Sequence, residues 1–296
     1  MRLLIEAIGF GIASGVVIAL GAVGFTVQFG ISNVLNITYG GLLTLAAFLG
    51  YAFLQLGIDI WVSLAITSVL IGVASVLFNR GLVTPLMRRG TGFVGVIIST
   101  VSAGIVLQYA IVAIAGPTAR SYGQLSGATV SGLGFVFTVS QLVLIGLTTV
   151  LMLAFHLLLT RTQLGRAMRA TATNRTVARA CGIRTERIID VAWLLSGLLC
   201  GAAGVALAIT TVSFDFTLGP TFLIYMIAAA VLGGIGQPYG AMIGGLVVGI
   251  SSQIAGAYWS PAYEDVIAFA ILIVMLLVRP RGLFSAGTAT RRLAAA

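Results

Sequence analysis

The 296-residue sequence contains no lysine, one histidine and seven acidic residues. A Walker A loop needs a lysine to reach the nucleotide phosphates, so the chain does not itself encode a conventional P-loop ATPase. The single histidine, His156, has no carboxylate or cysteine cluster near it in the sequence, and we expect neither a metal ion nor another cofactor on this chain. Enzymatic chemistry within a membrane would need converging acid, histidine or nucleophile groups. Since none converge in the sequence, we predict a protein that is not an enzyme.

The acidic residues avoid the middle of the apolar segments. All seven lie at or near predicted segment ends: Glu6, Asp59, Glu186, Asp190, Asp215, Glu264 and Asp265. A carrier driven by protons or sodium ions usually buries a carboxylate near the middle of the membrane, where the ion is bound and released. The sequence therefore indicates a passive channel, or a carrier whose energy comes from another subunit.

Hydrophobic residues make up 59% of the chain and charged residues only 8%. Soluble domains carry about 25% charged residues, so this composition predicts an all-α polytopic membrane protein. At about 20 residues per span, a single transmembrane domain over residues 1–296 has eight or nine crossings, with one segment re-entrant in the eight-crossing alternative. The candidate spans are about 8–29, 37–56, 61–79, 93–115, 137–159, 188–211, 221–235, 240–257 and 264–278.

One long polar run, TRTQLGRAMRATATNRTVARACGIRTER at residues 160–187, interrupts the apolar sequence. It carries seven arginines and a single acid. Arginine-rich loops stay on the cytoplasmic side of a membrane, so this loop fixes the orientation of the other segments. The C-terminus then also lies in the cytoplasm, and the N-terminus lies outside.

The arginine-rich loop also has the pattern of a folded segment. Leu164 and Met168 lie one helical turn apart. Asn174 can cap a second short helix, which Gly182 can then end. The glycine, asparagine and threonine interruptions argue against a voltage-sensing helix buried in the membrane. A folded cytoplasmic loop usually has something to dock on.

Polar residues interrupt two of the apolar segments. The first stretch, QFGISNVLNITYGG, contributes Gln28, Asn33, Asn36, Thr38 and Tyr39. Polar breaks at membrane depth are tolerated where protein or a water-filled cavity satisfies them. This stretch is therefore either part of a translocation path or a short cytoplasmic turn.

The second polar set, Ser99, Thr100, Ser102 and Gln108, lies within the fourth span. Serines commonly hydrogen-bond back to their own helix, which makes helix packing the simpler interpretation for the two serines. Gln108 needs a partner, because an amide group is costly in lipid. We retain Ser99, Ser102 and Gln108 as candidates for the path.

A third stretch, GGIGQPYGAMIGGLVVG, is rich in glycine. Glycines spaced four residues apart let helices approach closely, and this explains most of the pattern without a functional role. Pro238 in the middle favours a turn over a continuous span. The candidate packing glycines are Gly233, Gly234, Gly236, Gly240, Gly244 and Gly245.

Four stretches together resemble the inner-membrane permeases of ABC importers for branched-chain amino acids. TQLGRAMRATATNRTVARACGIRTERI resembles the cytoplasmic motif of that family, and AAAVLGGIGQPYGAMIGGLVVG resembles its glycine-rich motif. YEDVIAFAILIVMLLVRPRGLF resembles its final span, closed by R-P-x-G-L-F, and NVLNITYGGLLTLAAFLGYA resembles an early motif. The sequence departs from the family pattern at Thr38-Tyr39 and at Gln237-Pro238-Tyr239, and the first departure puts the exact substrate in doubt.

The resemblance implies a permease that works with other subunits. It implies a second related permease, two cytoplasmic ATPase subunits and a periplasmic or lipid-anchored substrate-binding protein. The arginine-rich loop would then couple ATP hydrolysis to transport by seating a short helix in a groove of the ATPase. The expected coupling residues are Gly165, Arg166, Ala167, Arg169, Ala170, Asn174, Ala178 and Gly182.

Two other functions compete with this importer. A stand-alone channel for a small neutral solute such as urea would share the glycine-rich spans and the lack of buried acids, but has no need for a long folded loop. A membrane scaffold without transport activity would tolerate apolar residues at Asn33, Asn36 and Gln108.

Overall fold

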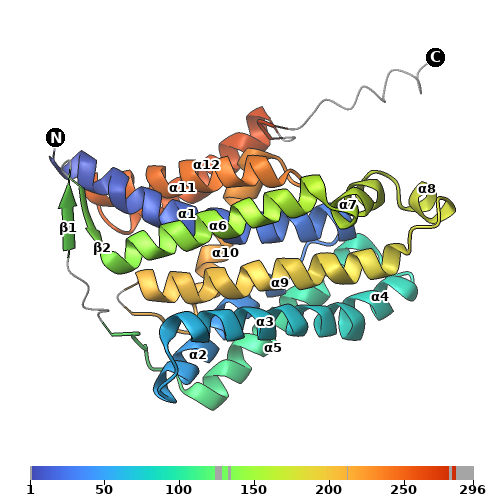
Figure 1. Ribbon diagram of the computed structural model, residues 1–296, viewed down its shortest axis with the longest axis horizontal. Helices are drawn as coiled ribbons and strands as arrows, with labels where there is room; N and C mark the ends of the chain where they lie inside the picture. Colours follow the sequence, from blue (N-terminus) through green and yellow to red (C-terminus); the bar gives the residue numbers. More distant parts are fainter. Residues whose placement is uncertain (1, 124–128, 133–134, 212, 280–281, 285–296) are drawn as a thin grey trace.

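The computed structural model describes residues 2–123, 129–132, 135–211, 213–279 and 282–284, and most of this chain is helical (Figure 1). The helical prediction is confirmed, with one small addition, an antiparallel hairpin of two short strands. The elements in chain order are α1 (Arg2–Ser32), α2 (Thr38–Gln55), α3 (Ile60–Phe78), the π-helix η1 (Asn79–Val83), α4 (Thr84–Arg88), α5 (Phe93–Ala115), β1 (Thr129–Gly132), β2 (Phe135–Thr138), α6 (Val139–Arg161), α7 (Gln163–Thr173), α8 (Arg175–Ala180), α9 (Thr185–Thr210), α10 (Leu218–Gly233), α11 (Pro238–Tyr258) and α12 (Tyr263–Val278).

Each predicted span coincides with a helix, with ends that differ by a few residues. In the described part of the chain, six helical stretches are long and apolar enough to cross a membrane: α1, the continuous run from α3 to α4, α5, α6, α9 and α11. Helices α2, α10 and α12 are shorter, with 18, 16 and 16 residues. Eight or nine crossings therefore remains a prediction.

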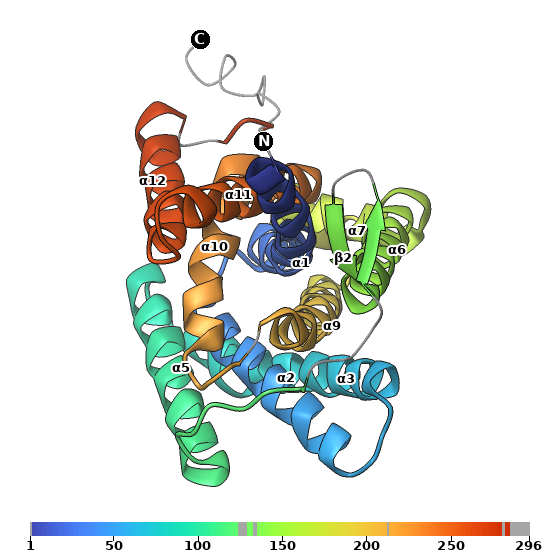
Figure 2. The same cartoon turned by 90° about the vertical axis from the view of Figure 1, so that its left-hand side faces the viewer.

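Helices α1 and α9 form the centre of the bundle. In each, 78% of the apolar stretch is buried, against 11% for α5 and 22% for α6. Viewed from one end, α1 and α9 are surrounded by the other long helices, whereas α5 and α6 lie at the periphery (Figure 2). An apolar helix with so little buried surface must meet lipid or another protein. Helix α5 is therefore the least buried of the six long apolar stretches, and the shorter α12 is also mostly uncovered, with Ala268 as its one buried residue.

Small residues bring the central helices together. A Cβ atom on Gly11 of α1 would lie 2.7 Å from the Cα of Ile250 in α11. On the other side, a Cβ atom on Gly201 of α9 would lie 2.7 Å from the Cα of Ser68 in α3. Such close backbone approach is the usual means of packing helices in membranes, where the hydrophobic effect does not drive helices together.

The glycine-rich stretch forms a turn, as Pro238 predicts. Helix α10 ends at Gly233, and α11 begins at Pro238. Between them, Gly234 and Gly236 take positive φ angles of 101° and 88°. The other glycines of this stretch pack backbone against backbone: Gly240 lies on Gly233, Gly244 on Ala229 of α10, and Gly245 on Ala19 of α1.

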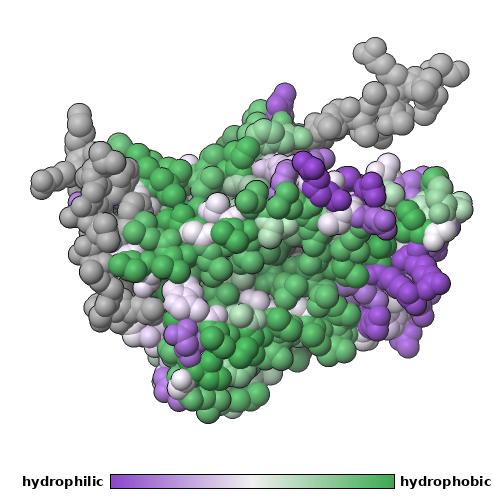
Figure 3. All heavy atoms as spheres, in the orientation of Figure 1, coloured by the Kyte–Doolittle hydropathy of each residue, from purple (hydrophilic) through white to green (hydrophobic). Residues whose placement is uncertain are grey.

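The two ends of the bundle differ in character. One end carries α7, α8 and most of the arginines, and is called the arginine-rich end below (Figure 1). Figure 3 shows hydrophilic surface gathered at that end and hydrophobic surface along the helices. At the opposite end, the segment after α5 pairs with the segment after α9 through a β-bridge between Arg120 and Phe214. The side chains of Tyr122, Phe214 and Tyr51 pack together there.

Candidate functional site

The arginine-rich loop folds into two capped helices. The hydroxyl of Thr162 accepts a hydrogen bond from the backbone N–H of Gly165 at 3.1 Å and so caps α7. The side chain of Asn174 accepts from Thr176 N and Val177 N, at 3.0 and 3.1 Å, and caps α8 as predicted. Beyond α8, Gly182 has a φ of 83°, so the predicted stop is confirmed.

One side of α7 and α8 faces the bundle and the other faces solvent. The inner side contains Met168, predicted with Leu164 to mark a helix, and Ala178; both are buried. Gly165 is also buried, and it packs so closely on the carbonyls of Leu158 and Leu159 that a side chain at this position would collide with them. Of the other residues predicted for coupling, Ala167 and Ala170 are half-buried, and Arg166, Arg169, Asn174 and Gly182 are exposed.

Two arginines attach the loop to the ends of neighbouring helices. Arg169 donates to the carbonyl of Leu159 near the end of α6. Arg175 donates through Nη2 to the carbonyls of Ile31 and Ser32 at the end of α1, at 2.9 Å each. These last carbonyls lack partners within their own helix and carry the negative end of its dipole, so a guanidinium is well suited to them.

The Arg175 contact holds a partly desolvated charge. Burial lowers the pKa of Arg175 from its ordinary value, and the nearby positive charge of Arg179 adds to the effect. Both causes disfavour the charged form, so the two carbonyls of α1 offset a real cost. Arg175 therefore fixes α8 against α1 rather than extending freely into water.

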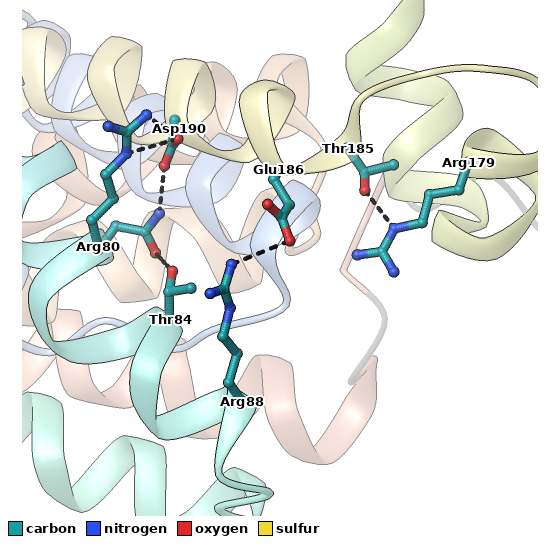
Figure 4. A network of polar contacts seen from close by, with 8 residues as sticks. Arg80, Thr84, Arg88, Arg179, Thr185, Glu186 and Asp190 are labelled. Carbon is teal, nitrogen blue, oxygen red and sulfur yellow. Dashed lines mark hydrogen bonds and ion pairs between the residues drawn. The ribbon is translucent and has the colours of Figure 1, made fainter.

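A second polar network joins α9 to η1 and α4 (Figure 4). Asp190 accepts from the Nε and Nη2 of Arg80, at 3.0 and 2.8 Å, and from the Nδ2 of Asn79 at 3.0 Å. Arg88 faces Glu186 at 3.4 Å. Asn79 is buried, so its hydrogen bond to Asp190 carries more weight than the exposed ion pairs around it. The π-helical segment that presents Asn79 and Arg80 is a local distortion frequently found at functional sites.

These elements enclose a cavity of about 650 Å³ at the arginine-rich end. It lies between the end of α1, η1, α4, α8 and the start of α9. Its walls carry five arginines against two acids: Arg80, Arg88, Arg175, Arg179 and Arg187 against Glu186 and Asp190. The cavity is thus electropositive and connects the loop directly to the end of α1.

The residues predicted for the translocation path lie in different places. Gln28 and Tyr39 are buried inside the bundle, where the Oε1 of Gln28 accepts from the hydroxyl of Ser196 at 3.0 Å. The hydroxyl of Tyr39 donates to the carbonyl of Gly21 at 3.0 Å. Asn33, with a φ of 56°, is exposed just after the end of α1.

Asn36 stands apart in the break between α1 and α2. Its side chain is buried, and neither its amide nitrogen nor its amide oxygen has a hydrogen-bond partner among the described residues. Leaving such a group buried and unpaired costs about 1–3 kcal/mol, and each instance in a folded protein calls for an explanation. Water or another polar group that reaches this break would supply the missing partners.

Three further predicted residues share one groove. Thr38, Ser99 and Ser102 line a mostly apolar groove of about 820 Å³ between α2, α3 and α5. Both serines bond back to their own helix, at 2.8 and 2.9 Å. Gln108 finds its partner in the carbonyl of Phe216, at 3.2 Å, and so links α5 to the segment before α10.

Sequence reasoning missed two features of the arginine-rich end. Val177 is 56% exposed on α8, where an apolar side chain gains nothing from water. Because Val177 lies within an arginine-rich run, nothing in the sequence singled it out. The second missed feature is the set of contacts that Asp190 makes with Asn79 and Arg80, residues about 110 positions away in the sequence. The one signal for these contacts was that all three residues lie near the ends of predicted spans.

Known proteins resemble this chain over most of its length. A family model described as the permease component of branched-chain amino acid transport systems matches residues 7–276. The high-affinity branched-chain amino acid transport system permease protein LivH of Escherichia coli (strain K12) is 32% identical over 92% of both chains. The corresponding protein BraD of Pseudomonas aeruginosa is 28% identical over 92% of this chain and 93% of its own length.

A probable LivH from Methanocaldococcus jannaschii is 28% identical over 88% of this chain and 86% of its own. Among solved structures, PsaBC from Streptococcus pneumoniae in complex with Fab aligns at a TM-score of 0.47 and 15% identity over 95% of this chain and 91% of that chain, a likeness too low to add to the assignment. The match of the family model and the identity to LivH over most of the chain are sufficient to assign the family. The chain belongs to the family of permease components of branched-chain amino acid transport systems.

Proposed function

We propose that this permease forms part of the translocation path of an importer for branched-chain amino acids or a related small solute, driven by ATP hydrolysis on separate subunits. The relatives named for branched-chain amino acid transport support the substrate class. They also favour an importer over a stand-alone channel for a solute such as urea. The uncovered face of α5 supports a second permease as partner, since the groove beside it contains Thr38, Ser99 and Ser102.

The observation that carries the coupling role is the construction of α7 and α8. Both helices are capped, and Arg169 and Arg175 hold them to the ends of α6 and α1. Loop charge that served only to set membrane topology would need none of these contacts. A protrusion held rigidly on its inner side can transmit a push received on its outer side. We assign the outer surface, with Arg166 and Val177, to a cytoplasmic ATPase subunit.

The route from the loop to the path runs through Arg175. Its guanidinium binds the end of α1, and the break that follows contains Asn33 and Asn36. A shift of α8 driven by closure of the ATPase subunits would pull on the end of α1 and change the surroundings of Asn36. The polar groups of the break would then face one side of the membrane at a time.

The same proposal fixes the orientation and the remaining partner. The arginine-rich end lies in the cytoplasm of a bacterial cell, with the chain in the inner membrane and the opposite end outside. A periplasmic or lipid-anchored binding protein would deliver the solute to that outer end. The chain itself then needs no cofactor, because ATP is bound and hydrolysed on the partner subunits.

Purification through this chain after gentle solubilisation of native membranes tests the proposal. Mass spectrometry of the purified material is expected to show a second permease and an ATPase subunit in stoichiometric amounts. Recovery of this chain alone, as an oligomer of itself, would contradict the importer and return the channel to consideration.

Replacing Asn36 by leucine is expected to impair uptake without lowering the stability of the chain. Leucine removes two buried polar atoms that have no protein partner, so the fold loses no hydrogen bond among the described residues. Uptake should fall at least about fivefold if these atoms serve the passing solute, which corresponds to a loss of roughly 1 kcal/mol. Initial rates of uptake in proteoliposomes of the complex, beside its thermal unfolding, measure the two effects separately.

Thr67→Val is the matched control for Asn36. The hydroxyl of Thr67 in α3 is also buried and without a partner among the described residues, but it lies outside the break. Valine keeps the shape of the side chain and removes the polar atom, so uptake should be unchanged. Unaltered kinetics in Asn36→Leu would exclude Asn36 from the path.

A further inference from the structure

A second cavity lies toward the opposite end of the bundle, far from the arginine-rich loop. It has a volume of about 180 Å³ and lies between α1, the start of α6, the end of α9, α10, α11 and the start of α12. Its walls mix apolar side chains, among them Phe10 and Phe222, with hydroxyl and amide groups and one carboxylate, that of Glu264. None of the residues predicted for the path or for coupling lines it.

Four hydroxyls around this cavity have their hydrogens engaged in hydrogen bonds within the protein. The hydroxyls of Ser14, Thr210 and Thr211 donate to helix carbonyls three or four residues earlier in the chain, at 3.0, 2.9 and 3.1 Å. The hydroxyl of Tyr225 donates to Asp265 at 2.7 Å. What these four hydroxyls still offer to the cavity is their oxygen lone pairs. A ligand that brings hydrogen-bond donors or positive charge can use these oxygens. The Nε2 of Gln141 remains as a donor on the same wall, because the Oε1 of Gln141 is the atom that accepts from Thr138 N.

Two side chains of α11 complete the polar wall. Gln253 donates through Nε2 to one oxygen of Glu264, at 3.0 Å, which holds the carboxylate over α11 and leaves the amide oxygen of Gln253 as an acceptor. Ser252 is 2% exposed, lines the cavity, and its hydroxyl has no hydrogen-bond partner among the described residues. A buried hydroxyl left unpaired beside a carboxylate points to a bound group that the protein alone does not provide.

We propose that this cavity binds one small monovalent cation, an alkali metal ion or a primary ammonium group. The donor set consists of one carboxylate, neutral hydroxyls and amide oxygens, which are hard ligands. A single carboxylate suits a single positive charge, and no arginine lines the cavity among the described residues. No group of three or more acidic, histidine or cysteine side chains that could hold a multivalent metal occurs in the described chain.

The position of the site indicates a stabilising ion rather than a transported one. Glu264 begins α12, Ser252 and Gln253 belong to α11, and Thr210 ends α9. A cation held between them would tie three helices together at the end of the bundle where the binding protein is expected to act. A co-transported ion would need a site near the middle of the membrane instead.

Equilibrium binding to the purified transport complex in lipid nanodiscs tests this site, with ²²Na⁺ and ¹⁴C-methylammonium as two separate probes. We expect at least one probe to bind saturably to this chain. Competition with unlabelled Na⁺, K⁺ and methylammonium then distinguishes an alkali ion from an ammonium group. Glu264→Gln should weaken binding at least about tenfold, because among the described residues it removes the only charged side chain that lines the cavity.

Glu186→Gln provides the matched control, since it makes the same change at the exposed arginine-rich end and should leave binding unaltered. Ser252→Ala provides a second test in case Glu264→Gln does not fold: alanine suits the helix and should still weaken binding severalfold. Binding of neither probe to the native complex, or equal binding to the native complex and Ser252→Ala, would overturn the proposal. Neither readout depends on uptake, so this result stands apart from the proposed transport function.

Discussion

Reversing the charge of Arg166 and Arg169 together, by Arg166→Glu and Arg169→Glu, is expected to lower uptake at least about tenfold while the chain still inserts normally. Both residues are exposed, and Arg166 lies on the side of α7 that we assign to the ATPase subunit. Placing like charges at a docking surface or removing a charge pair from it costs several kcal/mol, and about 1.4 kcal/mol already accounts for a tenfold loss.

The two arginines should contribute differently when changed singly. Arg169 also donates to the carbonyl of Leu159, so Arg169→Glu removes a support of α7 as well as a surface charge. Arg166→Glu should weaken contact with the ATPase subunit and leave the loop itself intact. Val177→Asp should behave like Arg166→Glu, because it replaces an exposed apolar side chain of α8 by a negatively charged one.

Uptake and ATP hydrolysis by the reconstituted complex, measured in parallel, identify the cause of the loss. If the loop couples the subunits, hydrolysis should persist without uptake, or the ATPase should no longer co-purify. Arg89→Glu is the matched control: Arg89 is exposed at the same end but lies outside α7 and α8. An equal loss in Arg89→Glu would mean that these arginines act through membrane topology, and normal uptake in the double variant would reject the coupling role.

The local chemistry of the chain made much of the fold predictable. Caps depend on single residues, so Asn174 and Gly182 could be assigned from sequence alone, and the turn at Pro238 follows from its missing N–H. Apolar runs likewise predicted the helices, because every backbone group in lipid must be satisfied within the helix. These predictions rest on neighbours within a few residues of each other.

The parts that could not be predicted depend on contacts between distant segments. Nothing near Asn79 in the sequence shows that the helix widens into a π-turn there and meets Asp190. The same holds for Ser252, whose unpaired hydroxyl becomes visible only when α11 and α12 are placed together. For the path, the sequence identified polar residues, but not that Thr38 and Ser99 would share a groove while Gln28 would be enclosed in the bundle.

The glycine contacts predict a second large effect, on stability. Gly240→Ala is expected to destabilise the chain by about 1–3 kcal/mol or more, the usual cost of forcing an extra methyl group into a packed site. At this position the Cβ atom would overlap the backbone of Gly233 itself, not the end of a flexible side chain. Helices α10 and α11 would have to move apart, since neither rotamer changes nor local adjustments can relieve a clash between backbones.

Gly146→Ala separates this effect from the general consequences of changing a membrane-helix glycine. Gly146 lies within α6, and a Cβ atom there would meet nothing within 4 Å. The same substitution should therefore be neutral, or stabilise the chain by up to about 1 kcal/mol through the higher helix propensity of alanine. Thermal unfolding of the two purified variants in one detergent gives the comparison.

If Gly240→Ala and Gly146→Ala unfold at the same temperature, the contact between α10 and α11 cannot be as close as the structure has it. The start of α11 would then tolerate side chains, and the glycines on either side of the turn before Pro238 would need another explanation.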